Sequence, residues 1–171
     1  MFPLRRLDIY LNDHLAGATL GVELSRRAAS ENEGTELGDF LQRLHREIAE
    51  DRGVLEGVMA ALAVDSSPAK PAGAWLLEKA GRLKLNGQLR GYSPLSRLAE
   101  LEALQAGVTG KRSLWQALDR TFPGDERLVR FDFDALIRRA DEQLEGIRDH
   151  RLATAPEALA DRASTRVQAP R

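Results

Sequence analysis

An uninterrupted heptad stripe constrains the fold of this chain more than any other feature of its sequence. Residues on the stripe are spaced four and three apart without exception, and all but one are apolar. They are Leu37, Leu41, Leu44, Ile48, Asp51, Leu55, Val58 and Leu62. This spacing places the side chains along one face of an α-helix and is typical of helices that pack against other helices. We therefore predict an all-α protein with a charged residue, Asp51, inside an apolar seam.

Periodicity and end signals predict four long helices. Thr35 is a suitable N-cap for the helix that carries the stripe, and Ser93 followed by Pro94 opens another. Asp132 begins the last helix, which we expect Pro156 to end. The predicted helices cover residues 4–30, 35–64, 94–121 and 132–155. A flexible tail is expected over residues 157–171.

The connections predict the topology of the bundle. The first and last pairs of helices are joined by short turns, whereas residues 65–93 form a long connection that we expect to contain a short extra helix. Short connections make antiparallel neighbours, and a single long crossover between two hairpins is the pattern of ferritin-like four-helix bundles. The alternative is a simple up-and-down bundle with an inserted helix.

Composition excludes several classes of function. The 171 residues include no cysteine, which rules out disulfides, thiolate metal sites and a cysteine nucleophile. The formal net charge of -1 and the low aromatic content argue against a nucleic-acid-binding protein on bulk properties. No apolar run is long enough to span a bilayer, so we predict a cytoplasmic protein. Nucleotide-binding and serine-hydrolase motifs are also absent from the sequence.

His14 is predicted to face Asp51 across the first hairpin. His14 lies on the apolar face of the first helix, and counting outward from a turn near residue 33 brings the two polar residues to the same height. An imidazole that donates to Asp51 would keep the carboxylate ionised and raise the histidine pKa. Such a pair would serve either as a metal or proton-transfer site or as an internal hydrogen bond that fixes helix register.

A second candidate site is a metal centre between the helices. Dinuclear sites of ferritin-like proteins use Glu-x-x-His pairs, and none occurs in this chain. If the third helix runs parallel to the second, four residues one position off their seams come to similar heights. This candidate metal set consists of Glu23, His45, Glu102 and Glu145. The alternative is that these side chains are solvated or paired at the surface.

The predicted crossover is locally basic. From Lys70 to Arg97 the only acidic residue is Glu78. An anion-binding surface in this segment would use Lys79, Arg82, Lys84 and Arg90. It would bind nucleic acid or an acidic partner, and the alternative is a solvated helix face.

Several segments resemble a family of uncharacterised bacterial ferritin-like bundle proteins. The resemblance is carried by Tyr10–Gly17, Gly81–Gly87 and Ser93–Ser96, and would span about residues 4–155. It implies the fold and no specific activity. Together with the missing metal motifs, it favours a non-catalytic, interaction or stress-associated module that self-associates, with a homodimer as the expected state and no cofactor. The alternatives are a carboxylate/histidine metal protein and an anion-binding protein.

Overall fold

The computed structural model describes residues 6–66 and 92–160 of the chain, and in these ranges it contains four α-helices and no β-strand. The helices are α1 (Arg6–Glu31), α2 (Glu36–Ala61), α4 (Pro94–Thr121) and α5 (Phe133–Leu159). An all-α fold of four long helices is therefore confirmed. The predicted crossover helix and most of the tail lie outside the described residues. None of the described helices is long and apolar enough to cross a membrane.

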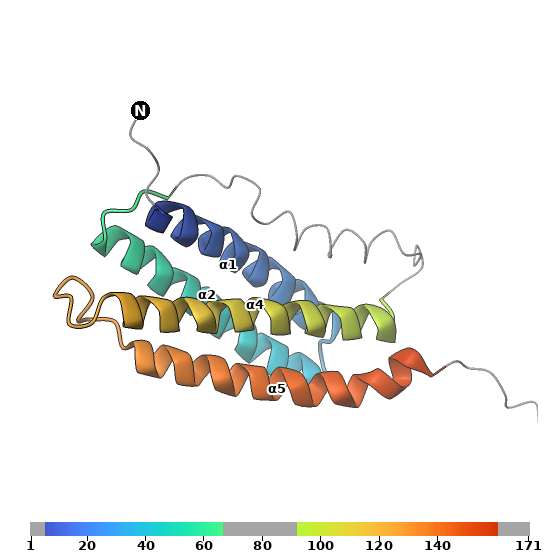
Figure 1. The fold of residues 1–171 in the computed structure, drawn as a ribbon. Helices are drawn as coiled ribbons and strands as arrows, with labels where there is room; N and C mark the ends of the chain where they lie inside the picture. The colour runs from blue at the N-terminus through green and yellow to red at the C-terminus, as the bar shows by residue number, and fades with distance from the viewer. Residues whose placement is uncertain (1–5, 67–91, 161–171) are drawn as a thin grey trace, which may run out of the picture.

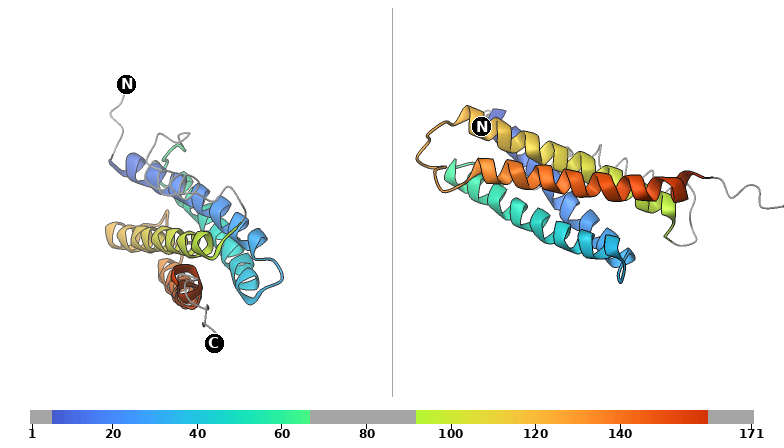
Figure 2. Two further views of the ribbon diagram at one scale, coloured as in Figure 1. Left: turned by 90° about the vertical axis from the view of Figure 1, so that its right-hand side faces the viewer. Right: turned by 90° about the horizontal axis from the view of Figure 1, so that it is seen from below.

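The helices form two antiparallel hairpins that pack side by side (Figures 1 and 2). One hairpin consists of α1 and α2, and the other of α4 and α5. α1 packs against α4, whereas α2 contacts α5. Because α2 ends and α4 begins at opposite ends of the bundle, these two helices run in the same direction (Figure 1). Those directions agree with the predicted crossover topology, while the ferritin-like assignment stays a prediction.

Helix ends follow the predicted capping residues. The Thr35 hydroxyl accepts a hydrogen bond from the Gly38 backbone N–H at 3.0 Å, and the Ser93 hydroxyl accepts one from Ser96 at 3.1 Å. The Asp132 carboxylate accepts one from the backbone of Ala135 at 2.8 Å. Each cap satisfies an N–H group that has no partner within its own helix.

The heptad stripe of α2 forms the centre of the core. Every member except Leu37 is buried, including Asp51. On one side of Asp51 the stripe packs into a cluster with Trp115 and Phe133, and on the other side into a cluster with Leu101 and Ile147. The charged position therefore lies between two apolar clusters rather than at an end of the bundle.

The prediction that Pro156 ends the last helix is wrong. α5 continues to Leu159, and the backbone N–H of Ala160 donates to the Pro156 carbonyl at 3.0 Å. Proline removes the hydrogen bond to the carbonyl four residues earlier, on Leu152. Both Pro156 and Leu152 are exposed, so water can satisfy that carbonyl and the final turn persists.

We expect two Gly→Ala substitutions in α2 to have opposite effects. A methyl group at Gly38 would collide with the backbone carbonyl of Asn32, whereas at the exposed Gly53 it would meet nothing within 4 Å. Gly38→Ala should lower the free energy of unfolding by about 2 kcal/mol, and Gly53→Ala should raise it by about 0.5–1 kcal/mol. Urea unfolding measures both, and equal effects would contradict this packing.

Candidate functional site

Small residues in the middle of α1 leave space between this helix and its neighbours. The inward face of α1 carries the small residues Ala18 and Gly21, and Gly21 faces Ile48 of α2. No residue between 12 and 24 of α1 is fully buried, although Leu11 and Ser25 on either side are. The centre of α1 contacts the core through Leu15, Val22 and Leu24 but is less deeply buried than the two ends of the helix.

The space forms a pocket of about 580 Å³ between α1, α2 and α4. This volume lies within the roughly 300–1,000 Å³ of small-molecule sites. The described lining runs along α1 from Asp13 to Arg27, about 21 Å at the rise of an α-helix. On α4 it runs from Ala103 to Trp115, about 18 Å. The pocket is therefore elongated along the bundle.

Glycines line the pocket without being needed for helix packing. A Cβ atom added at Gly17, Gly107 or Gly110 would meet nothing within 4 Å outside its own helix backbone and chain neighbours. Each glycine in a helix costs roughly 0.5–1 kcal/mol relative to alanine. Close approach of two helices does not explain these residues, because the space beside them is open.

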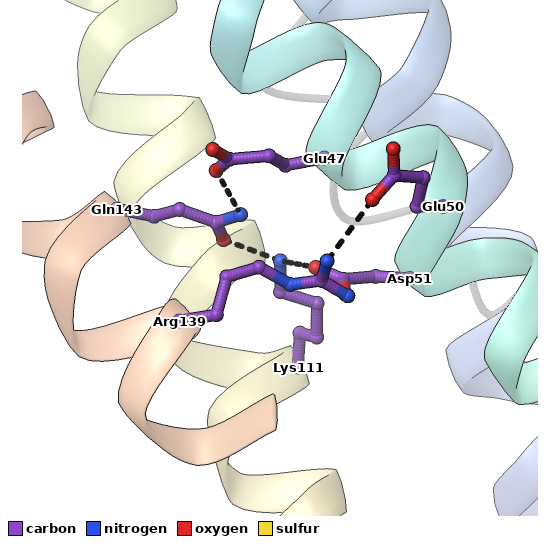
Figure 3. A network of polar contacts seen from close by, with 6 residues as sticks. All are labelled: Glu47, Glu50, Asp51, Lys111, Arg139 and Gln143. Atoms are coloured by element: carbon purple, nitrogen blue, oxygen red, sulfur yellow. Dashed lines mark hydrogen bonds and ion pairs between the residues drawn. The ribbon is translucent and has the colours of Figure 1, made fainter. Parts of the chain in front are cut away.

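Beside the pocket, a network of charged and polar side chains connects three helices (Figure 3). Asp51 of α2 is only 3% exposed, and its two carboxylate oxygens accept from Lys111 of α4 and Arg139 of α5. Lys111 also donates to Gln143 Oε1 at 2.5 Å, and Gln143 Nε2 donates to Glu47 at 2.8 Å. Asp51 and Lys111 line the pocket and form its floor.

Burial determines the electrostatics of the floor. Removal from water lowers the pKa of the Lys111 amine, and the Asp51 carboxylate opposes that effect. Arg139 also pairs with Glu50 at 3.0 Å, but the Glu50 side chain is 65% exposed. Two cations therefore share one fully buried carboxylate.

Two further donor groups of pocket-lining residues have no hydrogen-bond partner in the described part of the chain. One is the indole Nε1 of Trp115, a residue that is 1% exposed. The other is the Nε of Arg52, whose NH2 group pairs with Glu56 at 3.0 Å. By contrast, both oxygens of the floor carboxylate are occupied.

The predicted pair of His14 and Asp51 is not formed. Ser25 contacts His45 and Gly21 lies beside Ile48, and continuing this register places Asp51 level with Ala18, one turn away from His14. Asp51 was correctly predicted to be buried and paired, but its partners come from the other hairpin. His14 packs edge-on against Tyr10 with ring centroids 4.6 Å apart, and burial lowers its pKa instead of raising it.

The candidate metal set is not brought together. Among residues 6–66 and 92–160, no three His, Asp or Glu side chains are grouped so that they could hold a metal ion. Glu23, Glu102 and Glu145 are exposed. His45 Nδ1 instead lies 3.1 Å from the Ser25 hydroxyl. Residues one position off a seam point toward the surface. This outcome agrees with the alternative that these side chains are solvated or paired at the surface.

The candidate anion-binding residues Lys79, Arg82, Lys84 and Arg90 lie outside the described residues. The aromatic residue next to them, Tyr92, belongs to a structural cluster at the start of α4. Its hydroxyl donates to Glu100 at 2.8 Å and accepts from Asn32 at 2.9 Å. Arg97 donates to Asn32, and Arg27 pairs with Glu100, so the cluster joins α1 to α4.

The sequence contained a signal for two of the network residues. Lys111 follows Leu104 and Val108 at the seam spacing of α4, and Gln143 follows Leu136 and Ala140 at that of α5. Each is a polar residue within its own seam, as Asp51 is in α2. Matching the three polar seam positions would have predicted that they meet.

Compared with protein-family models, curated proteins and solved structures, the chain matches none of them. The site is therefore interpreted from its own residues.

We expect Asp51→Asn to be strongly destabilising, because it leaves Lys111 and Arg139 without their buried counter-charge. The free energy of unfolding should fall by about 3–5 kcal/mol. Asp141→Asn is the matched control, since Asp141 pairs with Arg112 but is 51% exposed. The control should cost less than about 1 kcal/mol. Similar losses for both variants in urea unfolding would contradict a buried network.

His14 should make stability depend on pH. Its pKa is lowered in the folded chain by burial, with the smaller opposing influence of Asp13. The unfolded chain therefore binds more protons at pH values between the lowered pKa and 6.5, so this residue makes stability rise with pH across that window. His14→Gln should remove the increment, measured as the difference in unfolding free energy between about pH 5 and pH 7.5. An unchanged difference would show that His14 titrates alike in both states.

Proposed function

We propose that this protein is a non-catalytic helical bundle that binds an elongated, predominantly apolar small molecule between α1, α2 and α4. The observation that carries the proposal is the open space beside Gly17, Gly107 and Gly110 in a pocket of about 580 Å³. Glycines that weaken their helices and contact nothing are explained if a ligand occupies the space, because they keep the walls free of side chains.

The chemistry of the lining favours an apolar body. Besides the glycines, the walls include Leu24, Leu55, Ala103 and Leu104. The lining cations are already paired within the chain: Arg26 with Glu23, Arg27 with Glu100, Arg52 with Glu56 and Lys111 with Asp51. A ligand that contacts mainly the walls would gain from burial of apolar surface.

The same pairing supports binding rather than catalysis. A general acid or base must exchange its proton with a substrate, whereas both oxygens of Asp51 are occupied by cations. His14 at the pocket edge has a pKa lowered by burial and no hydrogen-bonded orienting partner among the described residues. The sequence predicted an interaction module, and we propose that a small-molecule ligand is what it binds.

Self-association stays a separate prediction. The large exposed hydrophobic side chains of the described residues are distributed over α1, α4, α5 and the turn that joins the last two. They are Ile9, Tyr10, Leu95, Val129, Leu152 and Leu159. A ligand within one chain accounts for the glycine-lined space, so the proposal does not depend on a dimer.

The uncharged fluorophore N-phenyl-1-naphthylamine should report the pocket. We expect its fluorescence to rise on binding with one site per chain. Gly110→Leu should lower the affinity at least about tenfold, because the new side chain occupies space that is open in the native protein. Fluorescence titration gives both values.

Gly53→Leu is the matched control. Gly53 also faces open space in a helix but does not line the pocket. The control should bind the probe as the unmodified chain does. No binding by the unmodified chain, or equal loss in both variants, would contradict the proposed function. Light scattering at the titration concentrations separates a site within one chain from one between two copies.

A further inference from the structure

Lys111 has a donor left over at the pocket floor. An ammonium group has three N–H donors. Asp51 and Gln143 accept two of them, and the third has no acceptor among residues 6–66 and 92–160. Lys111 lines the pocket with a side chain that is only 14% exposed. The floor thus offers a donor, while both oxygens of its buried carboxylate are already occupied.

The charged groups of the floor differ in how deeply they are buried. Asp51, 3% exposed, is shared by Lys111 and by Arg139, whose side chain is 28% exposed. Glu50 offsets Arg139 only weakly, because it is 65% exposed and screened by water. Glu47, which is half-buried, accepts from Gln143 and acts on Lys111 from farther away. The one carboxylate in direct contact with the Lys111 ammonium group is shared with Arg139, so a ligand carboxylate would be attracted and would accept the remaining hydrogen bond.

We propose that the pocket binds a long-chain carboxylate whose head group accepts a hydrogen bond from Lys111. This inference rests on the proposed function and names the ligand class. Burial of an ionised carboxylate is unfavourable unless a cation and a donor receive it, and Lys111 provides both.

The position of Lys111 fixes the direction of the ligand chain. Arg27 pairs with Glu100 across the antiparallel helices α1 and α4, so Lys111 is level with Ala16, next to the lining residue Gly17. From Gly17 the pocket continues to Arg27 over about 15 Å, and in the other direction only to Asp13. The hydrocarbon chain therefore extends past Gly21 and Gly107 toward Arg27. A chain about as long as that of dodecanoate fits this distance.

Competition with N-phenyl-1-naphthylamine tests the head group. Dodecanoate should displace the probe from the unmodified chain at a concentration at least about tenfold lower than methyl dodecanoate or 1-dodecanol. In Lys111→Met this preference should disappear, with the affinity for the methyl ester changed less than about threefold. Arg112→Met is the matched control, since it removes a neighbouring cation that pairs with Asp141 and does not line the pocket. The control should keep the preference.

A measurement on the unmodified chain keeps the test valid if Lys111→Met does not fold. The carboxyl carbon of ¹³C-labelled dodecanoate should titrate at lower pH when bound than when free, because a nearby cation favours the ionised form. The carboxylate inference is overturned if the acid and the ester displace the probe equally, or if the pKa of the bound carboxyl group is unshifted or raised. In that case, binding of the probe still supports a site for an apolar ligand. If the probe does not bind at all, the proposed function is contradicted. Binding of the labelled dodecanoate then tests the carboxylate inference without the probe.

Discussion

One buried carboxylate connects three of the four described helices, α2, α4 and α5. Asp51 is inside the core of α2, where an ionised group is tolerated only if cations and hydrogen bonds replace its water. Lys111 and Arg139 supply them from α4 and α5. Sliding any of these helices by one turn, about 5.4 Å, would separate the charges. The two hairpins are therefore held at a single register, which apolar seams alone specify less strictly.

α1 takes no part in this charged network, and the pocket is the consequence. Its ends are fixed by other contacts, namely Leu11 in one apolar cluster and the hydrogen bonds of Asn32 with Tyr92 and Arg97. Between them the small residues Gly17, Ala18 and Gly21 leave space beside the core. The pocket and its charged floor therefore result from two separate features of the sequence. One is the charged residue in the seam of α2, and the other is the set of small residues on the inward face of α1.

The fold was largely predictable because it depends on local patterns. Helix positions follow from heptads, and helix starts from Thr35, Ser93 and Asp132. The partner of Asp51 was predicted wrongly, because a register taken from the turn was in error by one turn. Lys111 was recoverable from its seam position, whereas Arg139 was not, since it reaches Asp51 from a position beside the seam of α5. The pocket volume was also beyond prediction, because it depends on the spacing between helices.

The glycines of α1 and α4 also bear on how long the protein persists in a cell. A chain that gives up helix stability to keep a space open is less stable when that space is empty. A molecule that binds the folded chain alone would increase the folded population in proportion to its occupancy. Since proteases act mainly on opened chains, the abundance of this protein would then follow the supply of its ligand.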